Sequence, residues 1–371
     1  MFNSTPGSSF IHLNCASAFS FKYGTAQPRN LIARAAEFGA PALAITDRDS
    51  LAGVIRFVQA AKDFGVAPIV GVNLQLDKSP QYRVTLLAQS DGGWRSLCRL
   101  MSALRLDRNG PTLDLEKIKN LAEYTNNLIL LHGPESEIAN LISRHRPDQA
   151  LDLFNKYRPY FADSIIECTS HLVAGDGARS MIHAARMLGF ARDHDLPAVI
   201  TNAVRMLDAK DGPIADILDS ARKLVPLHPR HVERKNNEAY LKDGVAMQEL
   251  ADEIARAAGE RNGRALLRTT QRIAERCILS PNEFGLGGIE LPEPEVVGVS
   301  NYKEMRSLLR TRCESGLNWR YSSSSDLAKA RARLDDELAT VAMLGYESYF
   351  LTVADVSDMA RNAGIRVAAR G

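Results

Sequence analysis

The chain has 371 residues, of which 45% are hydrophobic and 24% are charged. This length predicts two domains, or one large barrel with an appendage, and the composition excludes disordered, collagen-like and disulfide-scaffold proteins. The chain has 46 Lys and Arg residues against 44 Asp and Glu residues, a formal net charge of +2. This balance neither requires nor excludes nucleic acid, because a local basic groove can occur in a neutral chain.

Short strands and helices alternate over the first 200 residues. Leu31, Ile32 and Ala35 recur at helical spacing behind Pro28, and Gly65 supplies a stop signal for the next helix. Repeated βα units with short apolar strands predict an α/β fold with a parallel sheet, open or closed into a barrel, whose chemistry lies at the C-terminal strand ends. The predicted helices cover residues 28–38, 51–64, 94–104 and 179–194, with helical patterns through residue 157. The predicted strands cover residues 10–14, 42–45, 68–76, 83–88, 127–131, 164–168 and 198–201.

The pattern becomes helical after residue 201. Gly and Pro are dense over residues 281–294, which places a domain boundary there. The serines at 322–325 predict a polar hinge, with Asp326 as the N-cap of the helix that follows. The chain then stops at Arg370-Gly371, just after a predicted strand, so we interpret it as cut inside a larger protein. The helices predicted in this part cover residues 244–257, 269–277, 301–316, 326–343 and 349–362, and the strand covers residues 365–368.

These patterns predict a first domain with a helical extension over residues 1–280, a linker over residues 281–300 and a last segment over residues 301–371. No apolar run is long enough to span a bilayer, and the N-terminal residues lack the basic and apolar regions of a signal peptide. We therefore expect a cytoplasmic protein with no membrane partner. Its cysteines are scattered, without a CxxC pair, and are predicted to be reduced thiols: Cys15, Cys98, Cys168, Cys277 and Cys313.

Several ordered blocks carry a family resemblance. HLNCASAFSFKYGT (12–25), PALAITDRDSLAGVIRF (41–57) and PIVGVNLQL (68–76) resemble the PHP domain that opens the bacterial C-family DNA polymerases, which are the DNA polymerase III alpha subunits and their error-prone paralogues. LLAQSDGGWRSLCRLMS (86–102) and LPAVITNAVRML (196–207) resemble later blocks of that domain. Residues 343–371 resemble the start of the polymerase palm. The pentapeptides SAFSF and ITDRD favour the error-prone type.

The resemblance implies a PHP-type distorted (β/α)7 barrel, then a mainly helical linker and an incomplete polymerase palm segment. It also implies a parent enzyme that copies DNA from dNTPs with Mg²⁺, in replication or in error-prone repair and translesion synthesis. A proofreading exonuclease or error-prone polymerase accessory proteins are the implied protein partners. The palm aspartates would lie beyond Gly371, so we assign this chain no catalytic residue and no cofactor, and we expect it not to polymerise DNA alone.

In the family, intact PHP domains hold a hydrolytic metal cluster of His, Asp and Glu at the strand ends. This chain departs from that pattern, and the glutamate after the third strand becomes Asn73. Asn14, Cys15, Ala16 and Ser17 stand in place of His-x-His-Ser, and Thr46, Asp47, Arg48 and Asp49 in place of Thr-Asp-His-Asp. Asn202, Ala203, Val204 and Arg205 stand in place of Asn-Asp-x-His. The implied degenerate metal-site positions are Asn14, Ala16, Asp47, Arg48, Asp49, Asn73, Glu167, His171, Ala203 and Arg205.

Metal binding at these positions is disfavoured by elementary chemistry. Alanine side chains offer no lone pair, and arginines bring permanent cations to the place of a divalent ion. We therefore expect no bound metal and a salt-bridged structural remnant, in which Arg48 or Arg205 pairs with a surviving carboxylate. The candidate carboxylates are Asp47, Asp49 and Glu167.

Single residues allow plainer interpretations. Asp49 is expected to cap the helix that begins near residue 51. His12 is expected at an edge or in the core, His132 in a loop, and His171 at the rim or in a solvated loop. Cys15 and Cys168 are expected to be buried thiols. Residues 229–235 are expected to form a solvated loop rather than a DNA contact, and Arg370 and Gly371 are phosphate-binding candidates or a frayed end.

Two other functions stay open from the sequence. One is a metal-dependent PHP-family phosphoesterase or 3′–5′ exonuclease, against which the missing ligands and the palm-like tail both count. The other is a docking module for polymerase accessory proteins, with no chemistry of its own.

Overall fold

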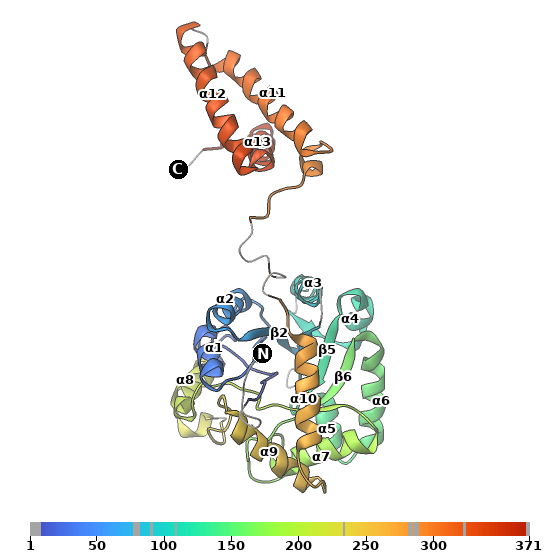
Figure 1. The fold of residues 1–371 in the computed structure, drawn as a ribbon. Helices are drawn as coiled ribbons and strands as arrows, with labels where there is room; N and C mark the ends of the chain where they lie inside the picture. Colours follow the sequence, from blue (N-terminus) through green and yellow to red (C-terminus); the bar gives the residue numbers. More distant parts are fainter. Residues whose placement is uncertain are drawn as a thin grey trace. The chain divides into compact units, whose positions relative to one another are not determined.

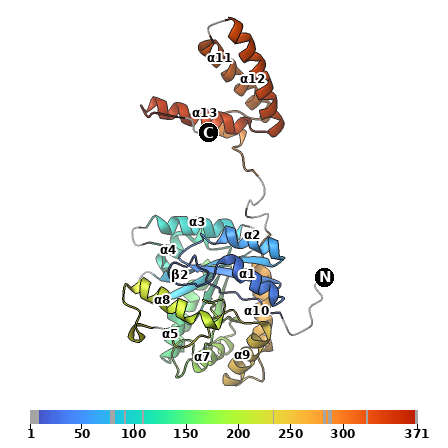
Figure 2. The same cartoon turned by 90° about the vertical axis from the view of Figure 1, so that its left-hand side faces the viewer.

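The computed structural model describes residues 9–76, 82–89, 92–107, 110–232, 234–280, 284, 289–321 and 324–368. The chain divides into two compact units, Met1–Leu286 and Gly287–Gly371. In Figures 1 and 2 the first unit contains the sheet with its helices, and the second contains helices only in its described part.

The first unit is built on a curved, mixed sheet of seven strands with the order β1-β2-β3-β5-β6-β7, and β4 pairs with β2. The pairs β1–β2, β5–β6 and β6–β7 are parallel, as predicted, but β3 runs antiparallel to both β2 and β5. The reason is the short connection between β2 and β3, which leaves no room for a crossover helix. The strands are β1 (Ala42–Arg48), β2 (Ala67–Leu76), β3 (Arg83–Ala88), β4 (Thr112–Leu113), β5 (Leu128–His132), β6 (Asp163–Cys168) and β7 (Ala198–Ile200).

Helices surround this sheet (Figure 1). In α1, Pro28 occupies the first turn, and Leu31 and Ile32 are fully buried, as their spacing predicts. Gly65 ends α2 in the left-handed conformation, with φ of 68°. The helices are α1 (Pro28–Glu37), α2 (Val54–Phe64), α3 (Gly93–Arg105), α4 (Leu115–Asn120), α5 (Glu137–Ser143), α6 (Pro147–Tyr157), α7 (Met181–Asp193), α8 (Gly212–Lys223), α9 (Gly244–Ala257) and α10 (Arg264–Cys277).

The two faces of the sheet have separate cores. Leu43 and Ile45 of β1 pack among the outer helices, whereas Ala42 and Ala44 pack in an inner core. This alternation follows from the two-residue period of a strand. The inner core is apolar at the start of the strands and is completed by α10. Its members include Ala42, Ala44, Ile69, Leu87, Ile129, Leu131, Ile165, Val199, Ile273 and Cys277.

The N-terminal segment, residues 12–16, joins the two edges of the sheet. On one side, Thr46 N donates to Cys15 O at 2.8 Å in β1. On the other side, Ala16 N donates to Val204 O at 2.8 Å, just after β7. The strand predicted over residues 10–14 is therefore wrong in extent: the structure has an isolated bridge at Cys15 instead. The segment makes its backbone hydrogen bonds alternately with two neighbours, which gives no continuous ladder to either.

The second unit consists of helices in its described part. These are α11 (Tyr302–Arg320), α12 (Ser324–Leu344) and α13 (Glu347–Asn362), close to the predicted ranges. Met305 and Leu351 are fully buried between them. Residues 365–368 are not a strand, because the described part of this unit offers no strand to pair with.

Candidate functional site

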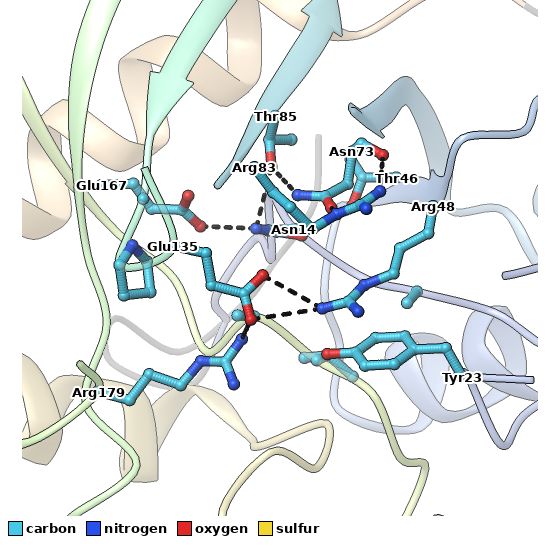
Figure 3. Close-up of a pocket in the computed structure, with 15 residues that line it drawn as sticks. Asn14, Tyr23, Thr46, Arg48, Asn73, Arg83, Thr85, Glu135, Glu167 and Arg179 are labelled. Atoms are coloured by element: carbon cyan, nitrogen blue, oxygen red, sulfur yellow. Dashed lines mark hydrogen bonds and ion pairs between the residues drawn. The ribbon is translucent and has the colours of Figure 1, made fainter. Parts of the chain in front are cut away.

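The C-terminal ends of β1, β2, β5 and β6 meet around a cavity that we call the mouth. Alternate residues of a strand face the same side of the sheet. Thr46 and Arg48 therefore lie on the inner face of β1 with Ala44, and Asn73 lies on the inner face of β2 with Ile69. The antiparallel β3 contributes its first residue, Arg83. Figure 3 shows these groups converging. The lining comprises Asn14, Ala16, Tyr23, Thr46, Arg48, Asn73, Arg83, Thr85, Gly133, Pro134, Glu135, Glu167, Arg179, Ala203 and Val204.

Glu135, in the loop after β5, is the anionic centre of the mouth. Arg179 Nη2 donates to its Oε1 at 2.7 Å, and Arg48 Nη2 lies 3.2 Å from its Oε2 (Figure 3). Burial alone raises the pKa of Glu135, but Arg179, Arg48 and Arg83 lower it to about 2. The carboxylate is therefore charged and shared by two guanidiniums.

Tyr23 is the aromatic platform of the mouth. The guanidinium carbon of Arg48 lies 3.4 Å from its ring centroid, and that of Arg205 lies 4.4 Å away. Burial raises the pKa of Tyr23, but Arg48 and Arg179 lower it, and its net value is below the ordinary one. The stacking holds the guanidiniums in fixed orientations and marks a region of positive potential.

Glu167 faces the mouth from β6 and accepts two hydrogen bonds at one carboxylate oxygen. Asn14 Nδ2 donates to its Oε1 at 2.8 Å, and Thr201 Oγ1 donates to the same oxygen at 2.5 Å. Burial raises its pKa, and these hydrogen bonds oppose the rise. The Asn14 amide thus donates a hydrogen bond to the carboxylate of Glu167, and an amide N–H group cannot ligate a metal ion.

Asp47 and Asp49 lie away from the mouth. Asp47 is on the outer face of β1, where Ser17 N (2.6 Å), Ser17 Oγ (2.9 Å) and Ser20 Oγ (2.7 Å) donate to it. Asp49 accepts from Arg83 Nη2 at 2.8 Å and from Gln75 N at 3.2 Å. The predicted capping role of Asp49 is wrong, because α2 begins at Val54 behind Gly53 and no side chain caps it.

The arginines are salt-bridged as expected, but to different partners. Arg48 pairs with Glu135, and Arg205 pairs with Asp219 through Nη1 at 2.9 Å and Nη2 at 2.8 Å. Arg205 also donates from Nε to the backbone oxygen of Tyr23. The expected pairing with Asp47, Asp49 or Glu167 is therefore wrong for these two, because those carboxylates are held by serines, Arg83 and Asn14.

The histidines and cysteines named at the predicted strand ends are buried. His12 and His171 are buried, and their Nε2 atoms lie 2.8 Å from Lys242 O and Asn202 O. Burial lowers the pKa of His12 to about 4 and that of His171 to about 3. The loop prediction for His132 is wrong: it ends β5, is buried, and packs on Phe154 and Tyr157. Cys15 and Cys168 are buried free thiols, as predicted.

The mouth does not fit a metal cluster. Among the described residues, no three His, Cys, Asp or Glu side chains converge to hold a metal ion. The mouth leaves about 30 Å³ open, room for one or two water molecules. Ala16 and Ala203 supply no ligand there, and three guanidiniums (Arg48, Arg83 and Arg179) supply positive charge instead.

Sequence reasoning did not identify Tyr23, Arg83, Glu135 or Arg179. The two-residue period of a strand would place Arg83 at the mouth if β3 were predicted to run antiparallel to its neighbours. Glu135 and Arg179 lie in loops, where no periodic pattern gives a side chain's direction. Within residues 229–235, Arg234 pairs with Asp216 at 2.6 Å. The candidates Arg370 and Gly371 lie outside the described residues.

Parts of the chain are similar to known protein families and to solved structures. The model of the PHP domain matches residues 12–171, and that of the bacterial DNA polymerase III alpha NTPase domain matches residues 307–371. Among solved structures, an amidohydrolase from Chromobacterium violaceum (15% identity, TM-score 0.36) covers 53% of this chain, which covers 87% of it. A Bacteroides vulgatus protein described as containing a predicted PHP-like metal-dependent phosphoesterase (12% identity, TM-score 0.34) covers 64% of each chain.

The curated relatives are polymerases. The error-prone DNA polymerase of Symbiobacterium thermophilum is 33% identical over 98% of this chain and 33% of its own length. That of Pseudomonas paraeruginosa is 30% identical over 98% of this chain and 32% of its own length. The DNA polymerase III subunit alpha of Buchnera aphidicola subsp. Schizaphis graminum is 28% identical over 96% of this chain and 30% of its own length.

The fold and the domain match together define a PHP-domain protein. More particularly, nearly the whole chain is similar to bacterial error-prone DNA polymerases and to a DNA polymerase III alpha subunit, in agreement with the resemblance of its sequence blocks. It spans about a third of the length of the curated relatives it matches. No helix in the described ranges has the length and apolarity to cross a membrane.

Proposed function

We propose that this chain is the N-terminal part of an error-prone-type DNA polymerase, in which the PHP unit is a scaffold and not a hydrolase. The observation that carries the second half of the proposal is the shared carboxylate of Glu135. Arg48 and Arg179 hold it at the strand ends where a metal-dependent PHP enzyme would need ligands. The similarity of the chain to error-prone DNA polymerases supports the first half.

The electrostatic cost of a divalent ion in this mouth is large. One guanidinium about 6 Å from such an ion, at an effective dielectric constant of about 20, repels it by roughly 5 kcal/mol, which is about four orders of magnitude in affinity. The mouth has three guanidiniums, and its charged carboxylate, Glu135, is already shared by two of them. Metal-generated hydroxide, which phosphodiester hydrolysis in such a site needs, would therefore not form.

We also propose a barrel architecture and domain bounds for this chain. The hydrogen bonds on both sides of residues 12–16 support a PHP-type distorted barrel. The division into two compact units after Leu286 supports domains over residues 1–280 and 301–371 with a linker between them. The helices of the second unit would begin the polymerase palm. In the parent enzyme, DNA, dNTPs and Mg²⁺ would be the substrates and cofactor, and accessory replication or repair proteins the partners.

Two assays test the proposal on the purified chain. Hydrolysis of p-nitrophenyl phosphate and of single-stranded DNA should stay at background with added Mn²⁺. Metal-dependent turnover that Glu167→Gln abolishes would instead support the phosphoesterase alternative, because Glu167 is the buried carboxylate of β6 at the mouth. Primer extension by the 371-residue chain alone should also be absent.

A further inference from the structure

A second cavity, which we call the basic cavity, adjoins the mouth and has a volume of about 360 Å³. It shares Tyr23, Arg48, Glu135 and Arg179 with the mouth. Among its described lining residues, Glu135 is the one carboxylate against six basic side chains. These are Arg48, Arg179, Arg205, Arg222, Arg234 and Lys235.

We propose that the basic cavity binds a phosphate-type oxyanion without a metal ion. The site thus keeps an anion-binding surface at the strand ends while its chemistry has changed from metal ligands to guanidinium groups. This binding role is separate from the scaffold role and from hydrolysis, because it needs neither a divalent ion nor bond cleavage.

The charge balance of the cavity supports this proposal. Glu135 is shared by Arg48 and Arg179, and Asp219 is shared by Arg205 and Arg222. The fifth guanidinium, that of Arg234, pairs with Asp216. In the lining, five guanidiniums and Lys235 thus face the carboxylate of Glu135 among the described residues, and this positive charge favours an anionic ligand.

The donor geometry supports the same class of ligand. Arg179 Nε is buried without a hydrogen-bond partner, and an orphaned buried donor is costly unless a ligand or water accepts from it. The described hydrogen bonds of Arg48 use Nη2, while Tyr23 orients its guanidinium by stacking. Guanidiniums fixed in this way match tetrahedral oxyanions through pairs of parallel N–H bonds.

A substitution of Phe21 distinguishes two sources of the phosphate group, a nucleotide and inorganic phosphate. Another cavity next to the basic cavity, also lined by Tyr23, Arg48 and Arg222, carries Phe21. The Phe21 side chain is 79% exposed, which makes it available for stacking on a nucleobase. A nucleotide would use both cavities, whereas inorganic phosphate would use only the basic one.

The test uses the full chain in EDTA at constant ionic strength, with inorganic phosphate or deoxyadenosine monophosphate as the probe. Phosphate should raise the melting temperature by several degrees over matched chloride and bind in a calorimetric titration. Arg179→Met should weaken binding at least tenfold, and Lys235→Met, at an exposed position that tolerates change, at least threefold. Arg29→Met, outside the cavity, should leave binding unchanged.

The same titrations identify the source. Tighter binding of the nucleotide than of phosphate, with a loss for the nucleotide alone in Phe21→Ala, assigns a nucleotide ligand. Equal binding of both probes, with no effect of Phe21→Ala, assigns free phosphate. The proposal is overturned if phosphate acts no differently from chloride in EDTA, or if Arg179→Met and Lys235→Met bind as well as the parent chain.

Discussion

Arg179 Nη2 lies 2.7 Å from Oε1 of Glu135, and the two residues come from loops that follow neighbouring strands β5 and β6. This ion pair is in the mouth. Arg48 completes the arrangement from β1. Charged groups of the protein therefore meet in the mouth, and its three guanidiniums favour anions.

Removing the shared carboxylate should destabilise the first unit. Glu135→Gln leaves Arg48 and Arg179 facing each other without a counter-charge, which should lower the free energy of unfolding by about 3 kcal/mol. Urea unfolding at pH 7 measures this. The matched control is Glu337→Gln, whose ion pair with Arg333 is largely exposed and should contribute less than about 1 kcal/mol. Equal effects of the two variants would contradict the role given to Glu135.

The acid limb of stability should depend on the same residue. Because the pKa of Glu135 is lowered in the folded state from 4.5 to about 2, its contribution is complete above pH 4.5 and is lost as the pH falls towards 2. Glu135→Gln should therefore show a shallower loss of stability across that window than the parent chain. Unfolding titrations between pH 5 and pH 2.5 measure the difference, and parallel curves would refute it.

Asp47 should act on stability and not on metal binding. Asp47→Ala removes the acceptor for Ser17 N, Ser17 Oγ and Ser20 Oγ, all buried, and should cost about 3 kcal/mol in the free energy of unfolding. Asp63→Ala, at an exposed ion pair with Arg29, is the control and should cost under about 1 kcal/mol. If Asp47→Ala were as stable as the parent chain, the outward orientation of this side chain would be wrong.

His132 should make the first unit sensitive to pH. Burial lowers its pKa from 6.5 to about 3, so its neutral form stabilises the fold above pH 6.5, and stability is lost as the pH falls from 6.5 towards 3. His132→Leu should make the pH dependence shallower by about 1.4 kcal/mol per pH unit between pH 6 and pH 4. Thermal unfolding over this range is the measurement. An unchanged slope in His132→Leu would contradict the burial argument.

Strand residues could be placed from the sequence because strands have a two-residue period. That period places Arg48, Asn73 and Glu167 at the mouth and Asp47 on the outer face of β1, once the strands and their direction are known. The sequence pattern does not show that β3 is antiparallel, because β3 and the helical segments near it fit the same alternation of strands and helices as parallel βα units. Its reversed direction is what brings Arg83 to the mouth.

The partners of the arginines could not be predicted in the same way. Glu135 follows β5 by three residues and Arg179 precedes α7 by two, and a loop's path depends on tertiary packing. Asp219 lies in α8, where only the docking of that helix brings it to Arg205. The sequence shows that cations replace ligands, whereas the choice of counter-ion emerges only from the fold.

The scaffold role of the mouth is tested most directly by a calorimetric titration of the metal-free chain with Mn²⁺. This ion prefers oxygen and imidazole ligands, so binding to the buried thiols does not complicate the result. We expect no saturable heat up to millimolar Mn²⁺, and less than a tenth of an equivalent of metal per chain by mass spectrometry after purification without chelator. One or more equivalents bound at micromolar affinity, and lost in Glu167→Gln, would contradict it.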